Sequence, residues 1–302
     1  MPSPLRQELD EALAAREVAG APGRASSRRI AGGAGWSVDD VICTSDARDR
    51  AFEERHSAVG IAFVVAGSFA YRSTTGRAVL APGATLLGNA DCCFECGHEH
   101  GAGDRCIAFQ FSTDFFERVA SDAGIVPSGR RFRTPRLPPL RELTPWVARA
   151  CTGLRTRSGA AWEELAIEVA ARVARLAAGA AGSIAGGARV PAGAEARVVA
   201  AVRQIDDDPA ADHSVARLAD TAKLSRFHFL RSFERVTGVT PHQFVLRARV
   251  RAAALRLATS AERVIDVAYE SGFGDLANFH HTFRAELGAT PARYRRSLAA
   301  EG

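Results

Sequence analysis

The chain has 302 residues, of which 47% are hydrophobic and 24% are charged, as in an ordinary soluble protein with room for two domains. The formal net charge of +5 suits an acidic partner but does not identify one. No run of about 18 uncharged apolar residues is present, which argues against a membrane-spanning helix. The N-terminus shows no apolar core of a secretory signal. We therefore expect a cytoplasmic protein whose six cysteines stay reduced or bind metal.

The first part of the chain divides into two segments of different composition. Residues 1–35 begin with a short charged stretch and continue through glycine, alanine, serine and arginine, which predicts a loosely held arm. Residues 36–112 contain short β-prone runs separated by turn residues, and this spacing predicts a β-sandwich or small barrel. The runs are 41–43, 60–67, 78–80, 85–87 and 106–111.

Residues 113–178 return to helical periodicity, and the strongest predicted helix covers 162–176. One apolar stripe runs along it, formed by Leu165, Val169, Val173 and Leu176. We expect this stripe to pack on the β-domain, or alternatively to form the seam of a homodimer. Residues 179–193 are rich in glycine and alanine without a periodic pattern, which predicts a flexible linker.

Residues 194–302 contain the same helical module twice. In each copy an apolar helix ends in a small residue, and a short turn leads to a second helix with Phe at positions i and i+4 and a closing Gly. The phenylalanine pairs are Phe229 with Phe233 and Phe279 with Phe283. This is the pattern of a helix-turn-helix, whose second helix enters the DNA major groove. The tandem copies predict an all-α domain that binds double-stranded DNA.

The two second helices supply the candidate DNA-binding residues, because their phenylalanines point inward and the opposite face is free. In the first module these are Ser225, Arg226, Phe227, His228, Leu230 and Arg231. In the second module they are Leu276, Ala277, Asn278, His280 and His281. A guanidinium such as Arg231 matches guanine O6 and N7, and Asn278 suits adenine N6 and N7. Ser225 is also the expected N-cap of its helix.

Between the modules, residues 241–258 predict a helix about 27 Å long. With the helices at its two ends, this rod places the second helices of the two modules, the two readers of DNA, about one turn of B-DNA apart, roughly 34 Å. The rod carries Arg247, Arg249, Arg251 and Arg256. These arginines are expected either to contact the DNA backbone or to form a solvated face.

The tandem modules resemble the DNA-binding domain of the AraC/XylS family of bacterial transcription regulators over about 100 residues. The residues that carry the resemblance are Leu218-Ala219, Phe229, Phe233, Thr237-Gly238, Pro241, Arg249, Ala268, Gly272-Phe273, Phe279, Phe283, Leu287-Gly288, Pro291 and Tyr294-Arg295. One departure concerns His281, where relatives often carry Arg. The contact that this position makes in the second module is therefore the least defined.

The resemblance implies an α+β chain with an N-terminal cupin-like barrel or sandwich, a helical connection and the C-terminal helix-turn-helix domain. In residues 36–112, His56, Gly67 and the Pro82-Gly83 pair are similar to such a sensor domain. The family implies a transcription regulator, here taken as an activator, with no enzymatic activity and no required cofactor. Its implied partners are promoter DNA, an unknown small-molecule effector, RNA polymerase and a second copy of the chain.

Residues 92–106 are a dense cluster of soft metal ligands, with four cysteines and two histidines. Cys96, His98 and His100 are candidate ligands for Zn²⁺ or Fe²⁺. The spacing matches neither paired C-x2-C ribbons nor the usual cupin metal motif. Along a strand, alternate side chains face opposite sides, so all six cannot converge. Two interpretations stay open: a metal or redox sensor, and a strand and polar loop with buried free thiols such as those expected at Cys43 and Cys151.

An enzyme is the alternative from another functional class. A cupin barrel with metal at His98 and His100 would suit an oxygenase, and a reactive cysteine would suit an alkyl-accepting protein fused to the same DNA-binding domain. No nucleophile, base and orienting residue form an identifiable set, which favours a regulator without enzymatic activity.

Overall fold

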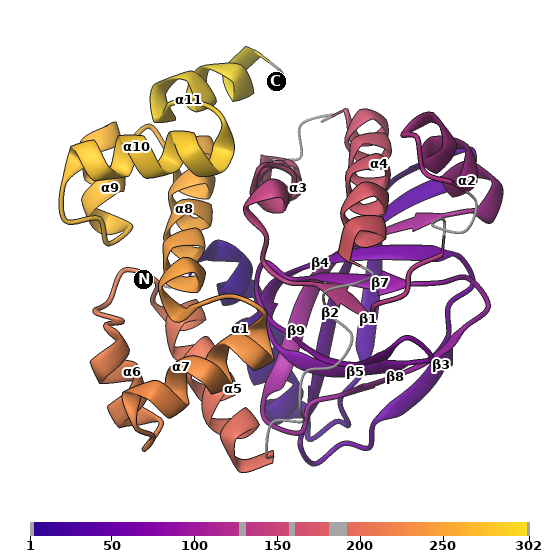
Figure 1. Cartoon of the computed structure of the whole chain (residues 1–302), viewed down its shortest axis with the longest axis horizontal. Helices are drawn as coiled ribbons and strands as arrows, with labels where there is room; N and C mark the ends of the chain where they lie inside the picture. Colours follow the sequence, from indigo (N-terminus) through magenta and orange to yellow (C-terminus); the bar gives the residue numbers. More distant parts are fainter. Residues whose placement is uncertain (1–2, 127–130, 157–160, 181–191, 301–302) are drawn as a thin grey trace.

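The computed structural model of the protein describes residues 3–126, 131–156, 161–180 and 192–300. Figure 1 shows a β-domain with its own helices beside a C-terminal domain made of helices alone, which confirms the predicted α+β class. Among the described residues, no helix is both long and apolar enough to cross a membrane.

The β-domain contains two antiparallel sheets that pack face to face. The larger sheet has the strand order β1-β2-β9-β4-β7-β10 and the smaller one the order β3-β8-β5-β6. Their strands are β1 (Ala25–Gly33), β2 (Trp36–Asp46), β3 (Phe52–Arg55), β4 (Val59–Gly67), β5 (Phe69–Ser73), β6 (Gly76–Leu80), β7 (Thr85–Gly88), β8 (Cys93–Gly97), β9 (Ala102–Phe111) and β10 (Arg136–Leu137). The sheet therefore extends past the predicted 36–112 at both ends.

Both faces of the central strands β4 and β9 of the larger sheet are buried, and the strand pleat separates them. On β4, Ile61 and Phe63 face a core shared with helices, whereas Ala62 and Val64 face the smaller sheet. Strand β9 repeats this division, with Cys106 directed between the two sheets. Successive side chains alternate in this way because the residues of a strand have a period of two. The near-continuous apolar runs in the sequence reflect this burial on two sides.

Three helices cover the outer face of the larger sheet: α2 (Thr113–Asp122), α3 (Thr144–Thr156) and α4 (Trp162–Ala180). The stripe of α4 is part of that core, since Leu165, Val169 and Val173 are at most 3% exposed. Packing of the stripe on the β-domain is thus confirmed. The same side chains are not available as a dimer seam.

The prediction of a loosely held N-terminal arm is wrong. Helix α1 (Pro4–Ala19) begins with the N-cap Ser3 and buries Leu5 and Leu9, and strand β1 follows it. Its charged residues are paired across the fold: Arg6 lies 3.2 Å from a carboxylate oxygen of Asp206. The polar composition that suggested an arm instead belongs to an ion-paired helix with a narrow apolar stripe and to an edge strand.

The C-terminal domain contains two cores that share one helix. Its helices are α5 (Ala192–Asp207), α6 (Val215–Thr221), α7 (Arg226–Thr237), α8 (Pro241–Thr259), α9 (Val264–Glu270), α10 (Leu276–Leu287) and α11 (Pro291–Ala300). Phe244 and Ala248 of α8 belong to the core of the first module, and Val250 and Leu257 belong to that of the second. Of the predicted linker, residues 181–191 lie outside the described residues.

The arginines of α8 make contacts inside the protein, so the expectation of a solvated face is wrong. Arg247 pairs with Glu286 and donates to the Pro139 carbonyl. Arg249 donates to the carbonyls of Pro209 and Ala211, and Arg251 donates to the Pro82 carbonyl. Arg256 pairs with Glu262 and Glu270. Pro82 and Pro139 belong to the β-domain and the segment that follows it. The rod between the two readers therefore also holds the two domains together.

Gly272 is needed where the turn of the second module meets the loop after α5. Its φ of +87° is in the left-handed region, and a Cβ there would lie 2.7 Å from the Ala210 Cα and 2.9 Å from the Arg249 Nε. Gly274, two residues later, has nothing within 4 Å of its Cβ position.

We expect Gly272→Ala to lower the free energy of unfolding by more than about 1 kcal/mol, through both the strained φ and the backbone clash. Gly274→Ala is the matched control and should change it by less than about 0.5 kcal/mol. Urea unfolding of the two variants, followed by circular dichroism, measures both. Equal stability of the two variants would contradict this packing of the turn.

Candidate functional site

Helix α7 is capped at both ends and buries one face. The Ser225 hydroxyl oxygen accepts the His228 N–H at 3.3 Å, and Gly238 ends the helix with a φ of 80°. Phe229 and Phe233 are fully buried, one turn apart, with ring centroids separated by 5.5 Å. Capping and this apolar pair fix the rotation of the helix about its axis.

The opposite face of α7 is open to solvent, as the sequence predicts. All six candidates in this module are exposed: Ser225, Arg226, Phe227, His228, Leu230 and Arg231. The Arg231 guanidinium lies over the Phe227 ring, 5.5 Å from its centroid. This cation–π contact restricts the side chain while leaving N–H donors for a base edge or a phosphate.

Helix α10 repeats this arrangement fifty residues later. The Asp275 carboxylate caps it by accepting the Asn278 N–H at 2.7 Å, and Gly288 ends it with a φ of 74°. Phe279 and Phe283 are fully buried. Figure 1 shows α7 and α10 near opposite ends of α8, so the shared rod positions both second helices.

The outward face of α10 is less uniform than that of α7. Ala277, Asn278 and His281 are exposed, whereas Leu276 and His280 are half-buried. Leu276 packs against the core of the second module. The Asn278 amide oxygen accepts from Thr282 at 3.3 Å, which leaves the amide NH₂ group for a base or a phosphate.

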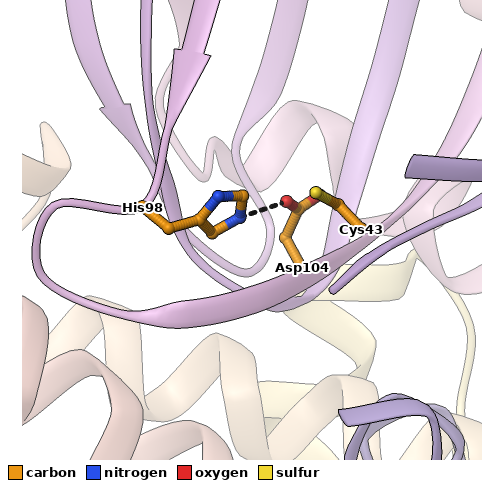
Figure 2. A group of neighbouring side chains, drawn as sticks. All are labelled: Cys43, His98 and Asp104. Atoms are coloured by element: carbon orange, nitrogen blue, oxygen red, sulfur yellow. Dashed lines mark hydrogen bonds and ion pairs between the residues drawn. The ribbon is translucent and has the colours of Figure 1, made fainter. Parts of the chain in front are cut away.

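A second candidate site lies inside the β-domain, where Cys43, His98 and Asp104 meet (Figure 2). Cys43 on β2 is directly opposite Asp104 on β9. The His98 Nε2 lies 2.8 Å from an Asp104 carboxylate oxygen. One ligand atom from each of the three residues lies within 4.8 Å of the others, and all three residues are at most 5% exposed.

Two further thiols lie near this group. The Cys106 Sγ donates to the second carboxylate oxygen of Asp104 at 3.3 Å. Burial raises the pKa of the Cys43 thiol, and raises the pKa values of Cys96 and Cys106 well above the ordinary value. These buried thiols are therefore protonated in the protein without metal.

The predicted ligand set of Cys96, His98 and His100 does not come together. Strand β8 ends at Gly97 and the chain then turns, and the Gly101 N–H donates a hydrogen bond to the His98 carbonyl at 3.4 Å. His100 is carried out of the sandwich, and its Nε2 lies 3.7 Å from Glu195 on α5.

Sequence reasoning did not connect Cys43 with this cluster and missed Asp104. The local spacing gave no sign of Cys43, which lies more than fifty residues before His98. Asp104 could have been found from the sequence, because it lies two residues before Cys106 on one strand and its side chain therefore faces the same side.

A second polar group, around the half-buried His56, lies between the sheets. The His56 Nε2 is 2.8 Å from the Tyr71 hydroxyl, and its ring stacks on Phe94 at 4.1 Å. A Cβ at Gly88 would lie 2.5 Å from the His56 ring, so that glycine makes room for the ring. Burial lowers the pKa of His56 to about 4, which keeps the imidazole neutral at physiological pH.

The family match lies in the helical domain. Residues 218–297 match a family described as helix-turn-helix domain. An uncharacterized HTH-type transcriptional regulator of Haemophilus influenzae is 31% identical over 103 residues, which are 34% of this chain and 35% of that protein. The RCS-specific HTH-type transcriptional activator RclR of Escherichia coli is 31% identical over 99 residues, 33% of either protein.

A solved structure also matches: the DNA-binding domain of AdpA in complex with a target DNA is 33% identical, with a TM-score of 0.34. That match covers 34% of this chain and 94% of the AdpA domain. The chain spans about a third of the length of the two curated relatives.

His56 predicts a pH dependence of stability. Its folded-state pKa of about 4 lies below the ordinary 6.5, so the unfolded chain binds the extra proton. Stability should then fall as the pH drops from 6.5 toward 4, by at most about 1.4 kcal/mol per pH unit from this group. We expect His56→Gln to flatten the profile in that window, while His242→Gln, on the exposed face of α8, keeps it. Urea unfolding at several pH values measures the slopes, and parallel profiles for His56→Gln and the wild type would contradict the assignment.

Proposed function

We propose that this protein, whose C-terminal part is a helix-turn-helix domain of the AraC type, is a transcription regulator that reads promoter DNA under the control of its β-domain. One observation carries the proposal. Two recognition helices, α7 and α10, bury equivalent phenylalanine pairs and present their opposite faces on one rigid support.

The support has the length that two adjacent major grooves require. Helix α8 has 19 residues, which corresponds to about 28 Å. Together with the helices at its ends, this agrees with groove-to-groove spacing of roughly 34 Å on one face of B-DNA. Because each half of α8 belongs to one module's core, the two readers are held at a fixed separation.

The β-domain contacts the DNA-binding domain through α5, which suits control by a bound effector. Arg77 makes two hydrogen bonds to the Glu195 carboxylate, at 2.9 and 2.7 Å. Asp206 accepts from the Gly67 N–H at 3.0 Å and pairs with Arg6. An effector that favours one arrangement of these contacts by 1–3 kcal/mol would be enough to change promoter occupancy.

Homodimer formation and a contact with RNA polymerase are further parts of this proposal, as is action in the cytoplasm, where bacterial DNA lies. The stripe of α4 packs inside the chain and does not supply the dimer contact. Another surface would have to do so.

The buried cluster does not favour the enzyme alternative. A catalytic or alkyl-accepting cysteine needs an accessible thiol with a lowered pKa. Cys43 is 4% exposed and burial raises its thiol pKa. Its Sγ donates to the Ser45 hydroxyl at 3.4 Å, which also differs from a Cys–His nucleophile pair.

Selection of bound sites from a random pool of DNA tests the proposal directly. We expect enrichment of two short half-sites whose centres are about 10–10.5 base pairs apart. Enrichment of a single half-site would contradict the role of the second module. No enrichment with folded protein, with or without cellular metabolites, would refute sequence-specific binding.

Arg231→Ala should weaken binding to the selected site by about 1–3 kcal/mol and relax one base position, because a bidentate contact to guanine is lost. Arg175→Ala is the control, since that arginine is exposed on α4 in the other domain. Titrations by fluorescence anisotropy with the selected site and its single-base variants measure both effects. An unchanged base preference in Arg231→Ala would refute its role as a reader.

A further inference from the structure

Among the described residues, no arginine or lysine pairs with the buried carboxylate of Asp104. It is 5% exposed, and within the described ranges its ion-pair partner is His98, whose imidazole carries a charge only when protonated. The Cys106 thiol, which is neutral, occupies its other oxygen. A buried charge is costly unless a cation or strong hydrogen bonds compensate it. This position therefore favours a cation.

The strand pleat explains why soft ligands surround this carboxylate. Asp104 and Cys106 are two residues apart on β9, so their side chains share a face. Cys43 lies on the same side because it is the direct cross-strand partner of Asp104. The loop after β8 then brings His98 over the group from the smaller sheet.

The donor set and its dimensions fit a tetrahedral metal site. Zn²⁺ binds thiolate at about 2.3 Å and imidazole or carboxylate at about 2.0–2.2 Å, so the ligand atoms of one tetrahedron lie about 3.3–3.8 Å apart. The imidazole and carboxylate atoms are 2.8 Å apart here, and the triad lies within 4.8 Å. Entry of the metal requires His98 and Asp104 to separate by roughly half an ångström. The Cys106 Sγ is outside the triad, 3.3 Å from the other Asp104 oxygen, and would have to turn toward the metal to become the fourth ligand.

We infer that Cys43, His98, Asp104 and Cys106 form a closed Zn²⁺ site, and that its occupancy controls the DNA-binding domain. Binding replaces the two thiol protons with the metal and releases them to solvent, with no change of oxidation state. All four positions are then occupied by protein ligands, as in a regulatory or structural site, without an open position for catalysis. The regulatory half of this inference rests on the proposed function; the metal site itself does not.

A short path joins the site to the DNA-binding domain. The loop that begins at His98 continues through Glu99 and His100, and the His100 carbonyl accepts from Arg203 on α5 at 3.1 Å. On the same loop, the His100 imidazole lies 3.7 Å from Glu195. Displacement of His98 by the metal would move the loop segment that touches α5. The cluster therefore communicates with the same helix that carries the other domain contacts.

Metal binding is tested on the full chain after removal of metals by a chelator. We expect one Zn²⁺ per chain in equilibrium dialysis. With Co²⁺ as the probe, we expect the visible bands of a tetrahedral ion and a thiolate charge-transfer band. His98→Gln and Cys106→Ser should each weaken the binding by at least about tenfold. The matched control is Cys93→Ser, on the same segment but exposed, which should keep wild-type binding.

Wild-type measurements alone can overturn the site, whether or not the variants fold. Folded protein that takes up no Zn²⁺ and shows no cobalt bands would refute the metal site and leave Asp104 hydrogen-bonded to His98. Equal loss of binding in Cys93→Ser would place the metal elsewhere in the cysteine segment.

Control of DNA binding is tested by titrating the selected DNA site with metal-free and Zn²⁺-loaded protein. We expect the affinity to differ by about 5- to 150-fold. Arg203→Ala, which removes the contact with the His100 carbonyl, should bind Zn²⁺ as the wild type does but reduce this difference. If the protein binds stoichiometric Zn²⁺ but its DNA affinity changes less than twofold, the metal does not regulate DNA binding, and only the metal site is supported. Zn²⁺ binding by a protein that selects no DNA would refute the proposed function and leave the metal site standing.

Discussion

Helix α8 must be buried on several sides at once, and the arrangement of both domains depends on how its sequence meets that demand. Its small and apolar residues serve two cores in succession, first with α7 and then with α10. A helix that presented one apolar stripe could not do this. Its remaining positions carry arginines, whose long stems pack while their guanidinium groups reach carbonyls and carboxylates. One helix thereby fixes both the separation of the two DNA readers and the position of the β-domain.

The same arrangement separates the parts of the protein that touch DNA from the parts that would sense a signal. The outward face of α7 is exposed and that of α10 is partly exposed, and within the described residues no hydrogen bond or ion pair joins either face to the β-domain. The contacts between the domains involve α5, α8 and the loop after β8, and also α10 and α11, since Arg141 donates to the Ala285 carbonyl and the Thr152 hydroxyl lies 3.3 Å from the Tyr294 hydroxyl. An effector bound in the sandwich would therefore change the positions of α7 and α10 rather than expose faces that were covered.

Much of the DNA-binding half could be predicted because its signals are local. Phenylalanine pairs one turn apart define the inner face of α7 and α10, and the outward residues follow from helical geometry. Strands β4 and β9 were also predictable from their β-branched and aromatic runs. Strand β1 was not, because it is an edge strand whose Ala-Ser-Ser-Arg-Arg start is exposed and shows no apolar alternation. The half-buried Leu276 shows that a helical wheel does not tell how far a core extends around a helix.

The interior cluster depended on information that no local pattern contains. The turn after Gly97 decides that His98 points inward and that His100 points toward α5. The register between β2 and β9 decides that Cys43 faces Asp104, and a slip of one residue would place Thr44 there. Long-range pairing, rather than composition, creates this site.

Arginines on α8 bind the β-domain through main-chain carbonyls, those of Pro82 and Pro139. A carbonyl acceptor is present whatever side chain its residue carries. The β-domain can therefore change many of its side chains while these two contacts persist, although the Arg77–Glu195 pair does depend on a side chain of the β-domain. At these two contacts the DNA-binding half alone supplies the side chains, so this part of the interface does not depend on the residue types of the β-domain.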